Sequence, residues 1–188
     1  RSQPEWVEPI RVNYRGYDVW ELPPNGQGLV ALLALKILAQ YQDLAPGDLE
    51  TYHRQIEAIK LAFADGKAYI TDPREIPVAI EDLLSDAYAI KRQHLISDTA
   101  LEPAPGTPPQ GGTVYLAVAD NQGNMVSYIQ SNYMGFGSGI VVSDTGISLQ
   151  NRGHTFSLDP KHVNCLKPGK RTYHTIIPGF LTRDGQPV

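Results

Sequence analysis

The sequence is poor in the features that define several classes of protein. It has one cysteine, Cys165, among 188 residues, so neither a disulfide framework nor a cysteine-based zinc site can be built from it. Its most apolar stretch, residues 29–38, contains Lys36 and is much shorter than the about 20 apolar residues that span a bilayer. The net charge of −4 excludes a basic surface over the whole chain. We therefore expect a folded protein with no membrane span and no nucleic-acid partner.

The two ends of the chain indicate that it is part of a longer gene product. Residues 1–5 lack the apolar core of a signal peptide, and the first residue is not Met. Residues 181–188 are typical of a hairpin turn whose second strand is cut off. We expect the chain to be an internal fragment of a longer protein. The cytoplasm is slightly favoured as the location of that protein. A periplasmic or extracellular location stays open if a signal peptide precedes residue 1.

The composition divides the chain into two regions joined by a linker. Residues 1–97 have mostly helical patterns, residues 113–188 mostly strand and turn patterns, and residues 98–112 hold four prolines and three glycines. Such a linker forms neither a helix nor a central strand. The first region predicts a hairpin over residues 10–22 around Gly16, then helices over 28–42, from 49 onward and over 80–96. The middle helix is amphipathic and has Asp48 as its N-cap, with apolar side chains at helical spacing: Leu49, Tyr52, Ile56, Ile59 and Phe63.

The second region opens with the strongest hairpin signal in the chain. Residues 113–119 and 125–131 are rich in β-branched and aromatic residues, and a tight turn at residues 120–124 joins them. Two further short strands are expected at residues 140–142 and 146–149. Together with the helical first region, these strands predict an α+β fold.

Several other patterns that could signal chemistry are weak in this sequence. The glycine-rich loop at residues 135–139 has no helix after it, so it lacks the helix N-terminus that holds a phosphate. The spacings of His154, His162 and His174 fit no compact metal site. No Gly-x-Ser-x-Gly motif is present, and we interpret Cys165 as a small buried thiol. We therefore predict neither a metal nor any other cofactor.

Thr113 is the most informative position. It follows Gly111 and Gly112, comes directly after the linker and opens the predicted hairpin. A threonine hydroxyl is a weak nucleophile at neutral pH unless a base lies beside it, and one solution is an N-terminal threonine whose own α-amino group is that base. Cleavage of the preceding peptide bond would create such a residue. A glycine before the bond leaves the scissile carbonyl accessible and tolerates a strained backbone.

Several spaced motifs follow one another along the chain. They are Pro9-Ile10, Tyr14-Arg15-Gly16-Tyr17, Val19 and Pro23-Pro24; Ala62, Ala64-Asp65 and Asp72-Pro73; Thr113, Asp120, Gly123-Asn124 and Val126; Phe136-Gly137-Ser138-Gly139 and Gly146-Ile147; and Lys167-Pro168-Gly169-Lys170-Arg171 with Pro178. Through these residues nearly the whole chain resembles the γ-glutamyltransferase family of N-terminal nucleophile hydrolases.

The resemblance implies an α+β fold of the N-terminal nucleophile hydrolase type, a sandwich of two β-sheets between helical layers, of which this chain holds a part. It implies autocatalytic cleavage between Gly112 and Thr113. Residues 1–97 would then be part of a large subunit, residues 98–112 a processing loop, and residues 113–188 the start of a small subunit that associates with the large one. Thr113 would attack the amide carbonyl of a small-molecule substrate, and water or an amine acceptor would release the acyl-enzyme. Ser131 stands where the family has a second hydroxyl residue that orients the nucleophile.

The sequence departs from the family at positions that recognise the γ-glutamyl group. Tyr133 stands where an asparagine usually contacts that group, and Arg152 and Thr155 lie where the family has Gln-x-Asp-Asp-Phe-Ser. The family's carboxylate there pairs with the substrate's α-ammonium group, and Thr155 cannot supply that charge. His174 and Thr175 replace two adjacent serines. We therefore expect these five residues to bind substrate, and the preferred acyl group to be acidic and without an α-amine, such as glutaryl.

Two alternative functions stay open. The protein could be a true γ-glutamyl transpeptidase or glutathione hydrolase, which a preference for γ-glutamyl substrates would show. It could instead be a non-catalytic homologue that keeps the fold as a binding or structural module, which a lack of cleavage before Thr113 would show. The resemblance places further site residues outside residues 1–188, so we expect this fragment alone to be inactive.

Overall fold

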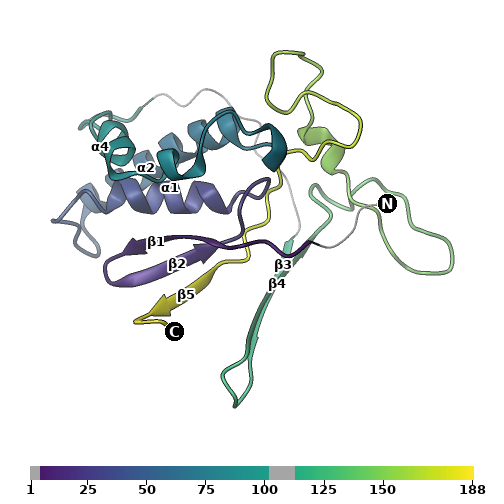
Figure 1. The fold of residues 1–188 in the computed structure, drawn as a ribbon, viewed down its shortest axis with the longest axis horizontal. Helices are drawn as coiled ribbons and strands as arrows, with labels where there is room; N and C mark the ends of the chain where they lie inside the picture. The colour runs from purple at the N-terminus through teal and green to yellow at the C-terminus, as the bar shows by residue number, and fades with distance from the viewer. Residues whose placement is uncertain (1–4, 102–112) are drawn as a thin grey trace.

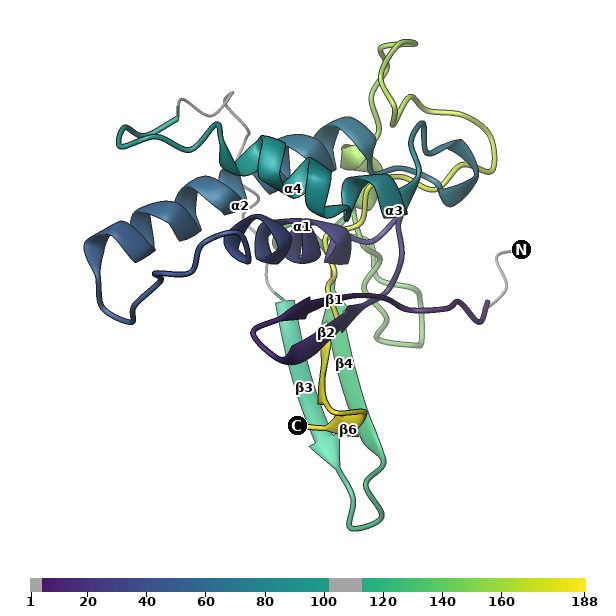
Figure 2. The same ribbon diagram turned by 60° about the vertical axis from the view of Figure 1, so that its left-hand side comes forward.

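The protein has a helical layer packed on a four-stranded sheet and a separate hairpin that extends away from the helices. The computed structural model describes residues 5–101 and 113–188. Figure 1 shows helices α1, α2 and α4 grouped above strands β1, β2 and β5, while the β3–β4 hairpin points away from them. The turned view in Figure 2 shows the same separation. Of the linker predicted over residues 98–112, residues 102–112 lie outside the described residues.

The four-stranded sheet joins the two sequence regions. In spatial order its antiparallel strands are β1 (Ile10–Tyr14), β2 (Tyr17–Glu21), β5 (Phe180–Arg183) and β6 (Gln186–Pro187). Val19 of β2 lies opposite Val12 of β1 and opposite Leu181 of β5. Arg15 and Gly16 both have positive φ in the β1–β2 turn, and the hairpin predicted around Gly16 is confirmed. Since β2 precedes the linker and β5 follows it, one sheet holds strands from both regions.

Helices α1 (Gly28–Leu38) and α2 (Leu49–Tyr69) pack against each other and form the centre of the core. α1 is apolar almost all round, and four of its large side chains are at most 2% exposed: Leu29, Leu32, Leu33 and Ile37. α2 begins at its predicted cap, since the Asp48 carboxylate accepts a hydrogen bond from Thr51 N at 3.3 Å. Both predicted helices are confirmed, although α1 ends at Leu38 rather than at residue 42.

The face of α2 that is most deeply buried is not the apolar stripe that marks this helix in the sequence. The contact with α1 uses small residues of α2, among them Ala62 and Gly66, and a Cβ on Gly66 would lie 2.5 Å from Cγ2 of Val30. The first part of the stripe is more than half exposed at each position: Leu49, Tyr52 and Ile56. Close approach of two helices requires small side chains at the contact, so packing decides which face of α2 is buried.

The single helix predicted over residues 80–96 is wrong, because two shorter helices form there. They are α3 (Ile80–Leu83) and α4 (Asp86–Gln93). Between them, the Ser85 hydroxyl accepts a hydrogen bond from Tyr88 N at 3.1 Å and donates one to Asp82 O at 2.7 Å. The same hydroxyl therefore ends α3 and caps α4, which is a local effect that apolar periodicity does not reveal.

The β3–β4 hairpin is confirmed, and Thr113 lies at its open end. β3 (Thr113–Ala119) pairs antiparallel with β4 (Met125–Ser131), and Thr113 lies opposite Ser131. The Asp120 carboxylate closes the turn, because it accepts hydrogen bonds from Gln122 N at 2.8 Å and Asn124 N at 3.0 Å. The turn chemistry thus fixes the register that brings Thr113 and Ser131 together.

The further strands predicted at residues 140–142 and 146–149 are wrong in extent. In this described stretch the chain makes an isolated bridge between Val141 and Ser148. Gly139, Asp144 and Gly146 have positive φ there, a conformation that turns the chain rather than extending it. The segment is therefore a long loop between β4 and the short 3₁₀ turn η2 (Arg152–Thr155).

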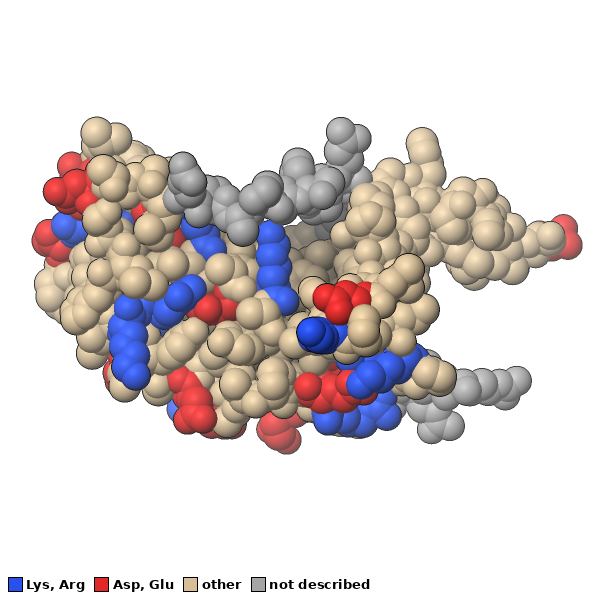
Figure 3. Space-filling view, turned by 90° about the horizontal axis from the view of Figure 1, so that it is seen from above, with Lys and Arg blue, Asp and Glu red and all other residues tan. Residues whose placement is uncertain are grey.

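Acidic and basic side chains are mixed on the surface of the protein. Figure 3 views the molecule from the helical side and shows Lys and Arg next to Asp and Glu rather than a patch of one sign. Lys167 and Lys170, for example, both pair with Glu75 at 2.8 Å. In the part of the chain that the structure describes, no helix has the length and apolar character needed to cross a membrane.

Glu21 is a buried carboxyl group at the junction of the sheet and the first helix. It is 6% exposed, and its Oε2 atom has no hydrogen-bond partner among the described residues. The carboxyl fills the space beside two glycines, since a Cβ on Gly28 would lie 2.6 Å from Oε2 and a Cβ on Gly179 would lie 2.8 Å from Oε1. Burial raises the pKa of Glu21 to about 7, because the charged form loses its hydration.

We expect Glu21→Gln to stabilise the protein in a pH-dependent way. Below pH 4.5 the carboxyl is protonated in both the folded and unfolded states, so burial of charge has no effect. As pH rises from 4.5 to about 7, the unfolded state ionises first and the folded wild type loses stability; above 7 both states are ionised and the loss is complete. At pH 8 the variant should be more stable than the wild type by about 3 kcal/mol. The partial positive charge at the N-terminus of α1 would reduce this difference, because it stabilises the ionised Glu21 carboxylate. Thermal melting at pH 5 and pH 8 measures this, with the exposed Glu8→Gln as a charge control. A stability gain that is equal at both pH values would contradict the assignment.

Candidate active site

The candidate site starts at the open end of the β3–β4 hairpin. The backbone of Thr113 pairs with that of Ser131, the last residue of β4. The Ser131 hydroxyl accepts a hydrogen bond from Tyr133 N at 3.0 Å, which leaves its own O–H free to donate. Gly112, on the other side of the predicted cleavage position, lies outside the described residues. The hairpin register therefore brings the backbone of the predicted nucleophile opposite its predicted hydroxyl partner.

Tyr133 turns the chain out of β4 in an uncommon conformation. Its φ is +78°, in the left-handed region that a bulky side chain rarely adopts. The turn directs its ring toward two basic side chains: the Arg152 guanidinium lies 5.4 Å from the ring centroid, and the His154 ring lies 6.1 Å away. Strained residues of this kind persist where the surrounding structure determines them, and they are frequent at functional sites.

Arg152 is the dominant charge of the site. It is 6% exposed, and its Nη1 donates a hydrogen bond to Thr175 Oγ1 at 2.8 Å. Its Nη2 is buried without a hydrogen-bond partner, and no Asp or Glu of the described residues pairs with it. Burial lowers the pKa of the guanidinium, which is the direction expected for a cation without an anion beside it. A buried, incompletely paired guanidinium is suited to accept a carboxylate.

The η2 turn that carries Arg152 is held by threonine hydroxyls. Thr155 Oγ1 donates to Arg152 O at 2.8 Å and also lies 3.1 Å from Thr172 Oγ1. Thr172 Oγ1 in turn donates to Thr155 O at 3.0 Å. The Thr155 hydroxyl is thus engaged within the turn, and its contact with substrate stays a prediction.

His174 contributes a neutral ring to the site. Burial and the nearby charge of Arg152 lower its pKa to about 4, so the imidazole is uncharged at neutral pH. Its Nδ1 accepts a hydrogen bond from Ile176 N at 3.4 Å, which places the ring proton on Nε2. His174 therefore presents an N–H donor beside the guanidinium rather than a second cation.

The structure brings most of the sequence-predicted residues into one connected group. Ser131 bonds to Tyr133, the Tyr133 ring contacts Arg152, Arg152 bonds to Thr175, and Thr155 holds the turn that carries Arg152. His174 precedes Thr175 in the chain. What the sequence did not reveal is the polar framework behind this group, above all Asn164: its Nδ2 donates to Ile70 O at 2.9 Å and its Oδ1 accepts from Tyr173 N at 3.2 Å. Nothing in the local pattern distinguishes Asn164 from a surface asparagine.

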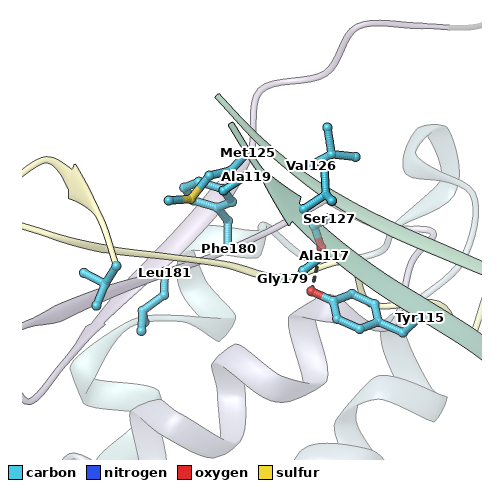
Figure 4. Close-up of a pocket in the computed structure, with 11 residues that line it drawn as sticks. Tyr115, Ala117, Ala119, Met125, Val126, Ser127, Gly179, Phe180 and Leu181 are labelled. Carbon is cyan, nitrogen blue, oxygen red and sulfur yellow. Dashed lines mark hydrogen bonds between the residues drawn. The ribbon is translucent and has the colours of Figure 1, made fainter. Parts of the chain in front are cut away.

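A separate cavity of about 360 Å³ lies away from this group, between the β3–β4 hairpin and residues 179–181. Figure 4 shows that its lining is mostly apolar and that the hydroxyls of Tyr115 and Ser127 point toward each other, 3.1 Å apart. None of the predicted site residues lines it. Its two polar side chains are bonded to each other, so the cavity offers no charge and no activated nucleophile for amide chemistry.

Comparison with known proteins places this chain and its fold in one class. A family model described as gamma-glutamyltranspeptidase matches residues 2–188. The crystal structure of cephalosporin acylase from Bacillus halodurans is 63% identical and superposes with a TM-score of 0.91, over 100% of this chain and 34% of that chain. The mixed helix-and-sheet fold is that of the N-terminal nucleophile hydrolases. Within that class, the chain belongs to the gamma-glutamyltranspeptidase family.

Two curated relatives are named as a hydrolase-like protein and an amidohydrolase. The glutathione hydrolase-like YwrD proenzyme of Bacillus subtilis (strain 168) is 45% identical, over 97% of this chain and 35% of its own length. The oxamate amidohydrolase proenzyme of Klebsiella pneumoniae is 41% identical, over 95% of this chain and 36% of its own length. The chain thus spans about a third of the length of these relatives. Its homologues are hydrolases and acylases, and both of these relatives are named as proenzymes.

Proposed function

We propose that the complete gene product is an amide hydrolase or acyltransferase that cleaves itself before Thr113, uses Thr113 as nucleophile, and prefers an acidic acyl group without an α-amine, such as glutaryl. The observation that carries this proposal is Arg152, a buried guanidinium whose Nη2 has no partner, and beside which no carboxylate lies, among the residues that the structure describes. The names of the relatives as proenzymes, amidohydrolase and acylase support the reaction class.

The acyl preference follows from the charges around Arg152. A carboxylate brought to Nη2 would pair with a cation that has already lost its water on folding, so the pairing would be favourable. An α-ammonium group, by contrast, needs an anion, and the predicted substrate-binding residues supply none: Tyr133, Arg152, Thr155, His174 and Thr175. Arg152 would also repel it. A dicarboxylic monoacyl group fits this environment better than a γ-glutamyl group.

The proposed reaction needs only the nucleophile, its own amine and water. Thr113 Oγ attacks the substrate's amide carbonyl while the Thr113 α-amine takes the hydroxyl proton; that proton then passes to the leaving nitrogen, and the C–N bond breaks. Water attacks the resulting ester, giving one proton back to the threonine oxygen by way of the same amine and releasing the acid. An amine acceptor in place of water would give acyl transfer. Ser131 would orient the hydroxyl or the amine, and its pairing with the backbone of Thr113 supports this role.

The same nucleophile accounts for self-cleavage. Thr113 Oγ attacks the Gly112 carbonyl carbon, the Gly112–Thr113 C–N bond breaks as its nitrogen gains a proton, and water hydrolyses the ester. The two products would stay together, because β2 of the first and β5 of the second pair in one sheet and Trp20 Nε1 donates to Thr182 Oγ1 at 2.8 Å. After such a cleavage, the two segments would be held together by this shared sheet.

We expect the complete, processed protein to hydrolyse a glutaryl anilide with a kcat/KM at least about tenfold above that for the γ-glutamyl anilide, a difference equal to roughly 1.4 kcal/mol of recognition. Release of the coloured aniline measures both rates, and a butyryl anilide reports the activity without any charged acyl group. A preference for the γ-glutamyl anilide would instead identify a true transpeptidase or glutathione hydrolase. A single uncleaved band on a denaturing gel, with no turnover, would identify a non-catalytic homologue.

A further inference from the structure

A loop of the first sequence region is bonded to the segment that carries His174 and Thr175. Asn25 Nδ2 donates a hydrogen bond to Thr172 O at 2.7 Å, and His174 N donates one to Asn25 O at 2.9 Å. Gly26 and His174 form an isolated parallel bridge. Tyr173 OH donates to Gln27 Oε1 at 2.8 Å. We call this set of contacts between residues 25–27 and 172–174 the clasp.

Arg152 depends on the clasped segment at two points. Its Nη1 donates to Thr175 Oγ1, one residue beyond the clasp. Its carbonyl accepts from Thr155, and the Thr155 hydroxyl and carbonyl both contact Thr172 Oγ1, within the clasp. The guanidinium and the backbone of Arg152 are therefore both positioned by residues 172–175. Within residues 5–101 and 113–188 no Asp or Glu pairs with Arg152, so these hydrogen bonds determine where its charge lies.

We propose that Asn25 is a positioning residue for the candidate active site. Asn25 precedes the predicted cleavage position in the sequence, and it orients Arg152 by holding residues 172–174, which follow that position. The proposal rests on the function proposed above, in which Arg152 receives the acyl carboxylate. Asn25 suits this task because it bonds to the segment through two different groups. Its side-chain Nδ2 donates to the backbone carbonyl of Thr172, and its backbone carbonyl accepts from the backbone N–H of His174. Together these two bonds fix both the position and the orientation of the segment.

The proposal distinguishes Asn25 from an ordinary structural residue by its effect on charged substrates. In Asn25→Asp, an oxygen replaces Nδ2 opposite the Thr172 carbonyl, so the donor is lost and two acceptors face each other. We expect KM for the glutaryl anilide to rise roughly tenfold, the effect of one lost hydrogen bond on the carboxylate's position, with kcat changed less. The butyryl anilide, which has no carboxylate, should be turned over as in the wild type. Asn121→Asp, in the exposed hairpin turn, is the matched control.

The decisive comparison is made in the complete processed protein with and without Arg152. If Asn25 acts through Arg152, Asn25→Asp should change KM for the glutaryl anilide little in an Arg152→Met background. Equal losses on the glutaryl and butyryl anilides, or fully additive effects of the two substitutions, would overturn the proposal. Asn25→Ala repeats the test without an added charge if the aspartate variant does not fold.

A second readout needs no substrate and so separates this proposal from the proposed function. The His174 amide is hydrogen-bonded to Asn25 O, and we expect peptides covering residues 172–176 to exchange hydrogen faster in Asn25→Asp and Asn25→Ala than in the wild type. If the wild type fails to cleave glutaryl amides while this exchange still accelerates, the proposed function falls and the clasp stands. Unchanged exchange in both variants would refute the clasp itself.

Discussion

Arg152→Met should raise KM for a glutaryl anilide by roughly 10- to 100-fold, because a hydrogen-bonded charge pair contributes about 1.5–3 kcal/mol to recognition. Turnover of a butyryl anilide should be retained, since that acyl group has no carboxylate to bind. The melting temperature should not fall: methionine fills a similar volume and removes a buried cation that lacks an anionic partner, which offsets the lost bond to Thr175. Steady-state kinetics on the two anilides and thermal melting measure these effects.

The control for this prediction is Arg183→Met. Arg183 also lies over a tyrosine ring, 5.2 Å from the centroid of Tyr17, but it is exposed and ends β5, a strand that holds none of the predicted site residues. We expect this variant to leave both KM values unchanged. If Arg152→Met weakened turnover of the acidic and neutral anilides equally, Arg152 would be a structural residue, and the acyl preference would need another origin.

Thr113→Ala should abolish both self-cleavage and turnover. Without the hydroxyl there is no atom to attack either the Gly112 carbonyl or the substrate, and removal of a nucleophile in hydrolases reduces kcat by roughly 10⁴- to 10⁶-fold. We expect one uncleaved band on a denaturing gel and no aniline release. The fold itself should be unchanged, because the β3–β4 pairing uses the backbone of residue 113.

Two further variants make this result interpretable. Thr113→Ser keeps a hydroxyl and should be cleaved, with a new N-terminal serine detectable by mass spectrometry. Thr145→Ala removes a hydroxyl that bonds only within the exposed loop between β4 and η2, and it should behave as the wild type. Cleavage after Gly112 in the Thr113→Ala protein would show that another group performs the processing.

The local elements of the fold were largely predictable from the sequence. The hairpins around Gly16 and at residues 120–124 follow from residues that favour tight turns, and the start of α2 follows from Asp48. The break at Ser85 and the buried face of α2 were not predictable, because a hydroxyl cap and a close contact with Val30 override the apolar spacing. Each miss is a case in which one specific contact outweighs an average pattern.

The candidate site was predictable as a set of residues and not as an arrangement. The resemblance to a family singled out Ser131, Tyr133, Arg152 and Thr175, and the structure joins them through two hydrogen bonds and a cation–π contact. The neutrality of His174 depends on burial and on Arg152, neither of which spacing reveals. Asn25 carried no signal at all, since its partner Thr172 is 147 residues away in the chain.

The sequence by itself determined the tight turns of the two hairpins, the start of α2, and the placement of Thr113 at the start of a strand. These properties depend on residues within a few positions of one another, where turn conformation and helical periodicity act. Only the tertiary structure decided that Arg152 is buried without an anion, that His174 is uncharged, and that a loop before the predicted cleavage position holds residues after it. Burial and charge pairing are set by segments far apart in the chain, so they exist only once the core has formed.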